Sequence, residues 1–191
     1  AITEIQWFKR AQEVAENNNF FHWKLEYPEV YYDVSGSEIS NPGFDAIVGN
    51  PPYVRINSLS DQKKEYLSKN YSGVYAGNSD ILYYFMTKSV KELRHGGLTG
   101  LIVARYFAEA QFAEGLREYL TQNVQIKKII DFGNYQAFSG VDVLADIVLF
   151  ERNDVQDYNV DILQLSDESY SDNVIQECLN DESEPAFVEY T

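Results

Sequence analysis

The sequence FDAIVGNPPY, residues 44–53, decides the fold class of this chain of 191 residues. Its first part, Phe44–Gly49, is a short and mostly apolar run that ends at three residues that interrupt regular structure, Asn50, Pro51 and Pro52. A short apolar run bounded in this way is typical of a strand buried in a parallel sheet. Ligands of open α/β sheets bind beyond the carboxyl ends of such strands, so a functional site is expected directly after this one.

Apolar periodicity and chain breakers predict further helices and strands on both sides of this strand. Helices are predicted over Ile2–Asn17, Ser60–Asn70 with Ser60 as its cap, Asp80–Leu93 with a stop at Gly96-Gly97, and around Phe112–Leu120. Strands are predicted within Phe20–Asp33 and over Leu98–Ala104, Ile126–Phe132, Val143–Phe150 and Val160–Leu165. This alternation predicts an α/β protein with a three-layer sheet. Two consecutive strands near its end have no helix between them, so one of them is predicted to be antiparallel.

The negative charge of the chain is concentrated toward its end. The net charge is −15, and residues 153–191 contain 11 of the 30 acidic residues and no lysine or arginine. Residues 1–152 therefore carry 19 acidic and 15 basic side chains, a net charge of −4. We predict a folded domain over residues 1–152 and an acidic extension over 153–191. Nucleic-acid-binding proteins usually present a basic face, so this chain alone is expected to bind nucleic acid poorly.

The composition argues against several classes of protein. The longest apolar runs, such as Leu101–Ala104, are too short to span a bilayer, and Ala1–Arg10 is not a basic start followed by an apolar block. Cys178 is the only cysteine, which excludes an internal disulfide framework and a cysteine-based zinc site. His22 and His95 are far apart and are interpreted as structural, so no metal site is predicted. A reducing cytoplasm is the simplest setting.

The residues Asn50-Pro51-Pro52-Tyr53 have the chemistry to hold an amino group of a heteroaromatic ring. Such an amine is a poor nucleophile because its lone pair is delocalised, and two oxygen acceptors opposite its N–H groups would favour a pyramidal geometry. Asn50 offers a side-chain carbonyl and Pro51 a backbone carbonyl, while Tyr53 offers a flat face for stacking. The alternative is a plain turn, which Asn-Pro often starts, but a turn does not require two prolines followed by an aromatic residue.

The same motif and its flanking segments resemble a known family of enzymes. FDAIVGNPPY at 44–53 is similar to the signature of amino-group DNA methyltransferases, above all the adenine-N6 enzymes of type IIG and related restriction–modification systems. Glutamine-N5 methyltransferases and several RNA-base methyltransferases have similar loops. The segment FHWKLEYPEV at 21–30 and the order of segments from 80 to 151 favour the restriction–modification enzymes. The resemblance covers residues 20–152.

The resemblance implies a Rossmann-like S-adenosylmethionine methyltransferase fold whose sheet is incomplete, with its C-terminal half present. It implies methyl transfer to the N6 atom of an adenine that is flipped out of the duplex, because the amine cannot react inside it. Asn50, Pro51, Pro52 and Tyr53 would form the catalytic loop, with Tyr53 stacked on the target base. Phe138 would pack against the same base, although core packing is the alternative for this residue.

The resemblance also assigns residues to the cofactor, S-adenosylmethionine. Phe85 would be an aromatic residue of the cofactor pocket, with core packing as the alternative. Asp80 would be a further cofactor residue, but a helix N-cap or first-turn acid is an equally good interpretation of it. Asn50 would border the cofactor as well as the base.

The chain departs from the family pattern at the main cofactor loop. The family has a Gly-x-Gly loop after its first strand, whereas no two glycines here are two residues apart, and Gly96-Gly97 precedes a strand. The chain is therefore interpreted as a partial catalytic domain, inactive alone, that acts on double-stranded DNA through a target-recognition domain not present in it. An RNA-base or protein-glutamine methyltransferase and a non-catalytic module are the alternatives. The oligomeric state is left open.

Overall fold

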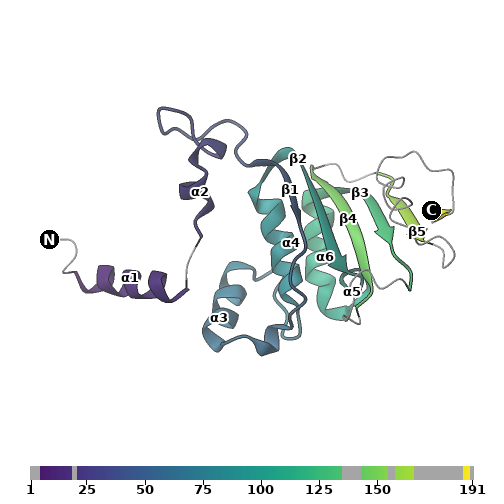
Figure 1. Ribbon diagram of the computed structural model, residues 1–191, viewed down its shortest axis with the longest axis horizontal. Coiled ribbons are helices and arrows are strands. Elements are labelled where there is room, and N and C mark those ends of the chain that lie inside the picture. Colours follow the sequence, from purple (N-terminus) through teal and green to yellow (C-terminus); the bar gives the residue numbers. More distant parts are fainter. Residues whose placement is uncertain (1–4, 19–20, 135–142, 155–157, 166–186, 190–191) are drawn as a thin grey trace. The chain divides into compact units, whose positions relative to one another are not determined.

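The computed structural model describes residues 5–18, 21–134, 143–154, 158–165 and 187–189 (Figure 1). The chain divides into two compact units, Ala1–Pro42 and Gly43–Thr191. The second unit carries a six-stranded sheet. The predicted boundary at residue 152 falls inside this unit, because two strands of the sheet, over 161–165 and 187–189, lie beyond it.

The first unit is built from short helices. They are α1 (Gln6–Asn18), α2 (Trp23–Glu26) and the 3-10 helix η2 (Pro28–Val30). The first of these confirms the helix predicted over Ile2–Asn17. The strand predicted within Phe20–Asp33 is wrong. The ring of Trp23 lies 6.1 Å from that of Tyr27, four residues on, and 4.8 Å from that of Phe21, just before α2, so these aromatic side chains pack around a short helix rather than across a ladder of strands.

The sheet of the second unit mixes parallel and antiparallel strands. Its strands are β1 (Phe44–Gly49), β2 (Leu93–Ala104), β3 (Val124–Asp131), β4 (Ala145–Arg152), β5 (Asp161–Leu165) and β6 (Phe187–Glu189). Their order across the sheet is β1-β2-β4-β3-β5-β6. β1 is parallel to β2 and β3 to β5, while β4 inserts antiparallel between β2 and β3. The predicted antiparallel pair and the strand predicted over Val160–Leu165 are thus confirmed.

Two helices cover one face of the sheet. The helices of this unit are α3 (Asp61–Asn70), α4 (Ile81–Glu92), α5 (Tyr106–Glu109) and α6 (Glu114–Asn123), with the 3-10 helices η3 (Ile56–Ser58) and η4 (Gln111–Ala113). α4 packs on β2 and α6 on β3, and the two helices contact each other (Figure 1). Their apolar side chains, with those of the strands, form the core: Leu82, Met86, Val90, Leu101, Val103, Leu116, Leu120, Val148 and Phe150. Ser60 stands at the N-cap of α3 as predicted, but its side chain makes no capping hydrogen bond.

The opposite face of the sheet is open near β1. Successive side chains of a strand alternate between faces. Ile47 accordingly packs against the core, whereas Val48 is 84 % exposed, and Leu98 of β2 is 50 % exposed. The described residues thus provide the sheet and one helical layer of the predicted three. None of the described helices is long and apolar enough to cross a membrane.

The connection between α4 and β2 differs from the prediction. β2 begins at Leu93, directly after α4, and the two predicted stop residues lie inside the strand. The pairing with β1 jumps from Leu93 to Leu98, so the segment that contains Gly96 and Gly97 bulges. A Cβ atom on Gly97 would lie 2.8 Å from the carbonyl oxygen of Phe44, which explains a glycine at this close approach.

Candidate functional site

The predicted catalytic loop follows β1 at the carboxyl edge of the sheet. β1 ends at Gly49, and Asn50 begins the loop, as predicted. β2 and β3 also end at this edge, at Ala104 and Asp131, because they run parallel to β1. The antiparallel strand β4 begins there, at Ala145. The ends of four neighbouring strands therefore lie along the edge from which the loop projects.

The loop presents an exposed amide beside an anchored aromatic ring. Asn50 is exposed, Pro51 is buried and Tyr53 is half-buried. The hydroxyl of Tyr53 donates a hydrogen bond to the carbonyl oxygen of Ile102 at 3.2 Å, and its ring packs against the core. Burial, and less strongly the carboxylate of Asp146, raise the pKa of Tyr53. The phenol thus remains a neutral donor, and this hydrogen bond ties the ring to β2.

A buried carboxylate connects this loop to two helices. Asp80 is 1 % exposed. Its Oδ1 accepts hydrogen bonds from the backbone amides of Val54 at 3.1 Å and Leu82 at 3.0 Å, and its Oδ2 accepts one from the hydroxyl of Tyr106 at 2.9 Å. The interpretation of Asp80 as a helix N-cap is confirmed. Burial first, and then the hydrogen bond to Asp80, raise the pKa of Tyr106, so Tyr106 stays a donor.

Backbone hydrogen bonds reinforce this connection. The amide of Ile81 donates to the carbonyl oxygen of Val54 at 2.8 Å, and the amide of Ile56 donates to the carbonyl oxygen of Ser79 at 3.0 Å. Arg55, between Val54 and Ile56, is exposed. Its guanidinium carbon lies 5.2 Å from the centre of the Tyr106 ring. Neither Arg55 nor Tyr106 was predicted from the sequence. Their positions on the chain, just after the loop and just after β2, are the signal that could have found them.

A second charged cluster lies at the same edge. Arg105 forms ion pairs with Asp131 and, at 3.3 Å, with Asp146, and it donates to the carbonyl of Gly133 at 3.0 Å. Asp146 is 3 % exposed. Burial raises the pKa of Asp146 to about 6, against the opposing effect of the Arg105 guanidinium. The cluster thus braces the start of the segment after β3, while the predicted base-packing residue Phe138 lies outside the described residues.

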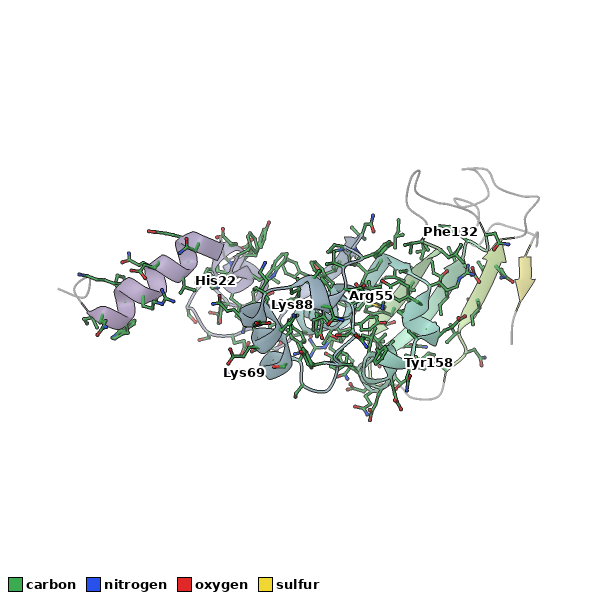
Figure 2. All side chains as sticks on the ribbon, turned by 90° about the horizontal axis from the view of Figure 1, so that it is seen from below. His22, Arg55, Lys69, Lys88, Phe132 and Tyr158 are labelled. Carbon is green, nitrogen blue, oxygen red and sulfur yellow. The ribbon has the colours of Figure 1, made fainter. Side chains whose placement is uncertain are left out.

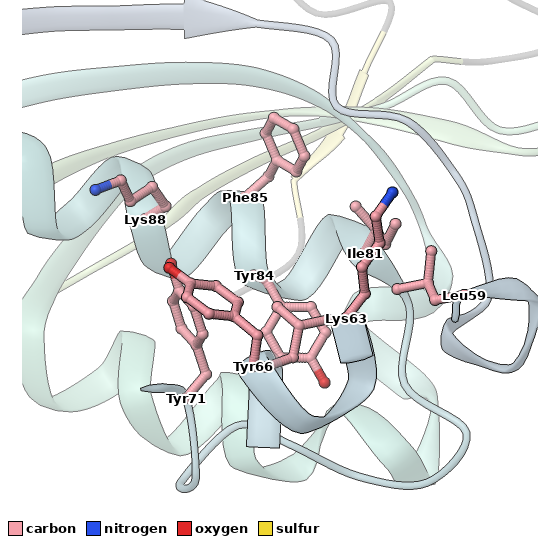
Figure 3. A pocket seen from close by; sticks show the side chains of 9 residues that line it. Leu59, Lys63, Tyr66, Tyr71, Ile81, Tyr84, Phe85 and Lys88 are labelled. Carbon is pink, nitrogen blue, oxygen red and sulfur yellow. The ribbon is translucent and has the colours of Figure 1, made fainter. Parts of the chain in front are cut away.

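The predicted cofactor residue Phe85 borders a cavity of about 310 Å³ between α3 and α4 (Figure 3). The ring is 48 % exposed, although it lies on the helix that supplies much of the core. The cavity is lined by Leu59, Lys63, Tyr66, Leu67, Tyr71, Ile81, Tyr84, Phe85 and Lys88. Figure 3 shows Tyr66, Tyr71 and Tyr84 gathered below Phe85 in this view. The lining suits a flat and largely apolar group. No metal-ligand cluster of His, Cys, Asp or Glu occurs among the described residues.

Solved structures with the same fold define the class of this protein. The type I restriction–modification methyltransferase subunit of Streptococcus thermophilus superposes with a TM-score of 0.57 at 15 % identity, over 76 % of this chain and 34 % of that one. A putative class I S-adenosylmethionine-dependent methyltransferase of Listeria monocytogenes gives a TM-score of 0.51 at 15 % identity, over 77 % and 45 %. The fold is therefore that of S-adenosylmethionine-dependent methyltransferases, present in part.

The sequence comparison narrows this class to one family. Residues 2–138 match the Eco57I restriction-modification methylase family, and the chain belongs to that family. The type II methyltransferase M.HincII of Haemophilus influenzae is 34 % identical over 143 residues, which are 74 % of this chain. The chain spans only 28 % of the length of that relative. The resemblance to restriction–modification methyltransferases is thus confirmed.

The raised pKa of Asp146 predicts a stability that depends on pH. A carboxyl group with a pKa of about 6 when folded and about 3.8 when unfolded binds its proton more tightly in the folded state. Its contribution to stability is complete below pH 4 and is lost as the pH rises through 6. Relative to Asp146→Asn, the free energy of unfolding of the unmodified chain should fall by about 2–3 kcal/mol over this window. Urea titrations followed by circular dichroism at several pH values measure this difference.

The exposed carboxylate of Asp61 offers the matched control. Asp61→Asn makes the same change in net charge, and its stability should follow the pH dependence of the unmodified chain. If the curve of Asp146→Asn also runs parallel to that of the unmodified chain, the effect attributed to burial of Asp146 is absent.

Proposed function

We propose that this chain is the target-base part of an adenine-N6 DNA methyltransferase of a restriction–modification system. The observation that carries the proposal is the loop after β1, in which an exposed Asn50 stands beside the anchored ring of Tyr53. Family membership supports it. Because the chain spans 28 % of the length of its relative M.HincII, the activity belongs to a larger protein that contains this segment.

The loop suits an amine that must be made nucleophilic. The Oδ1 atom of Asn50 and the carbonyl oxygen of Pro51 accept the two N–H groups of the adenine amine and draw its lone pair out of conjugation. Pro52 restricts the backbone behind them. The ring of Tyr53 stacks on the extruded base and holds the amine against these acceptors. No side chain of raised basicity is needed for this, since the nitrogen would become strongly acidic once methylated and would then release its proton to water.

S-adenosylmethionine is the proposed cofactor, and when bound it supplies an electrophilic methyl group on a positively charged sulfur. Among the predicted cofactor residues, Phe85 fits this group best, because its ring is half-exposed beside an apolar cavity. Asn50 lies at the carboxyl edge of the sheet, directly after β1. Both oxygens of Asp80 accept hydrogen bonds from within the chain, so we assign to this residue the placement of the loop.

Double-stranded DNA is the proposed substrate, recognised with the help of a basic target-recognition domain outside this sequence. The near-neutral charge of residues 1–152 supports this division, since 19 acidic residues face 15 basic ones. RNA-base and protein-glutamine methylation remain the alternative activities, and incorporation of methyl groups into RNA or protein, with none into DNA, would identify them. The segments from 80 to 151 favour the DNA enzyme.

Replacement of Asn50 tests the proposed reaction directly. In the full-length protein that contains this chain, Asn50→Ala should lower methyl transfer to duplex DNA by about 100-fold or more, because a fixed acceptor that acts on the reacting group is lost. DNA binding should change little. The measurements are transfer of labelled methyl groups and the formation of N6-methyladenine in digested DNA. Asn70→Ala, which removes an exposed amide at the end of α3, is the matched control. Equal activity of Asn50→Ala and the control would remove Asn50 from the mechanism.

A pair of substitutions separates the two roles of Tyr53. Tyr53→Phe keeps the ring and loses only the hydrogen bond to Ile102, which should cost about 1 kcal/mol of stability and little base capture. Tyr53→Ala should weaken capture of the extruded base by about 1–3 kcal/mol. Fluorescence of 2-aminopurine at the target position measures base extrusion. Equal capture by the two variants would refute the stacking role.

The isolated chain is expected to bind S-adenosylmethionine weakly and to transfer no methyl group. The sequence contains no Gly-x-Gly loop to hold the cofactor. The chain also spans only 28 % of the length of its relative M.HincII. Isothermal titration calorimetry of the 191-residue chain measures the affinity. A dissociation constant in the micromolar range would contradict the interpretation as an inactive part.

A further inference from the structure

Arg55 is an exposed cation next to the proposed base-binding loop (Figure 2). It lies two residues after Tyr53, and two residues of extended chain span about 7 Å. Within the described part of the chain, no carboxylate forms an ion pair with its guanidinium. The group lies instead over the ring of Tyr106, with its central carbon 5.2 Å from the ring centre. Its positive charge is thus available to a ligand.

The surrounding structure fixes the direction of this side chain. The neighbours of Arg55 are held by backbone hydrogen bonds, from Ile81 to Val54 at 2.8 Å and from Ile56 to Ser79 at 3.0 Å. Arg55 is itself extended and exposed, whereas the side chain of Ile56, which begins the 3-10 helix η3, is buried and anchors the backbone at this point.

The ring below the guanidinium is fixed as well. The hydroxyl of Tyr106 donates to the Oδ2 atom of Asp80 at 2.9 Å. Both oxygens of this carboxylate accept hydrogen bonds from Val54, Leu82 and Tyr106, so Asp80 fixes the ring on which the Arg55 guanidinium lies. A cation held in advance loses less conformational entropy when it binds.

We propose that Arg55 contacts a backbone phosphate of the DNA strand that carries the target base, an inference that rests on the proposed function. An adenine stacked on Tyr53 remains joined to its own flanking phosphates, which therefore come close to the loop. A guanidinium donates two parallel hydrogen bonds to phosphate oxygens. Contacts of this kind set the register of a protein on the duplex and carry no sequence information. Arg55 is accordingly a positioning residue for the extruded nucleotide.

The salt dependence of DNA binding tests this role. With the full-length protein and a duplex that contains its target site, the logarithm of the association constant falls linearly with the logarithm of the salt concentration. Arg55→Gln should make this negative slope shallower by about 1. Affinity should fall about tenfold at 50 mM salt and less at 200 mM. KM for DNA should rise accordingly, while kcat should change less than about twofold. Arg55→Lys should keep the slope, because a lysine also neutralises one phosphate. A purely structural role of Arg55 would not change the slope.

Lys127 provides the matched control for the loss of one positive charge. It lies on β3, away from the strand's carboxyl end, and pairs with Glu151 at 2.9 Å. Lys127→Gln should bind DNA with the unmodified slope. An unchanged slope for Arg55→Gln in a protein that methylates DNA would refute the phosphate contact alone. Weaker binding of S-adenosylmethionine by Arg55→Gln with an unchanged slope would also refute it. Absence of DNA methylation by the unmodified protein would refute the proposed function and this inference together.

Discussion

The placement of the proposed base-binding loop depends on the burial of one carboxylate. Asp80 is 1 % exposed, and among the described residues no cation forms an ion pair with it. A buried charge without hydrogen bonds is costly, so the fold must bring donors to it. Val54, Leu82 and Tyr106 supply them from the loop, from α4 and from α5. Satisfying this one group therefore fixes three segments against each other.

Charged and polar groups gather at one edge of the sheet for a topological reason. β1, β2 and β3 are parallel, so their carboxyl ends and the residues that follow lie together, and β4 adds its first residues from the opposite direction. Arg105 can for this reason contact both Asp131 and Asp146. Asp146 in turn acts on Tyr53. The charges along this edge are thus coupled, so that a change of charge at the start of β4 affects the pKa of Tyr53 in the loop after β1.

The sequence was informative where local signals dominate. An apolar run ended by Asn50 and two prolines located both β1 and the loop, because strand propensity and chain breaking are properties of neighbouring residues. The predicted burial of this strand was wrong, since β1 forms one edge of the sheet and none of its residues is buried. Asp80 as a helix cap was accessible for the same reason. The strand predicted within Phe20–Asp33 failed because aromatic residues pack equally well at helical spacing, which propensity alone does not reveal. The contacts of Arg105 and Tyr106 join segments more than 20 residues apart, and no local pattern reports them.

The charge of the chain favours a proposed division in which this segment binds the target base and the rest of the proposed enzyme binds and recognises the DNA site. Sequence readout requires contacts to base edges in the grooves, and tight DNA binding requires many phosphate contacts. Residues 1–152 have 15 basic side chains against 19 acidic ones, and several of the basic groups are spent on ion pairs, as Arg105 and Lys127 are. In the proposed function, such a segment would hold one extruded nucleotide by stacking, two amine acceptors and a single phosphate contact. Its specificity is then for the chemistry of the base, and the choice of site on DNA must come from elsewhere.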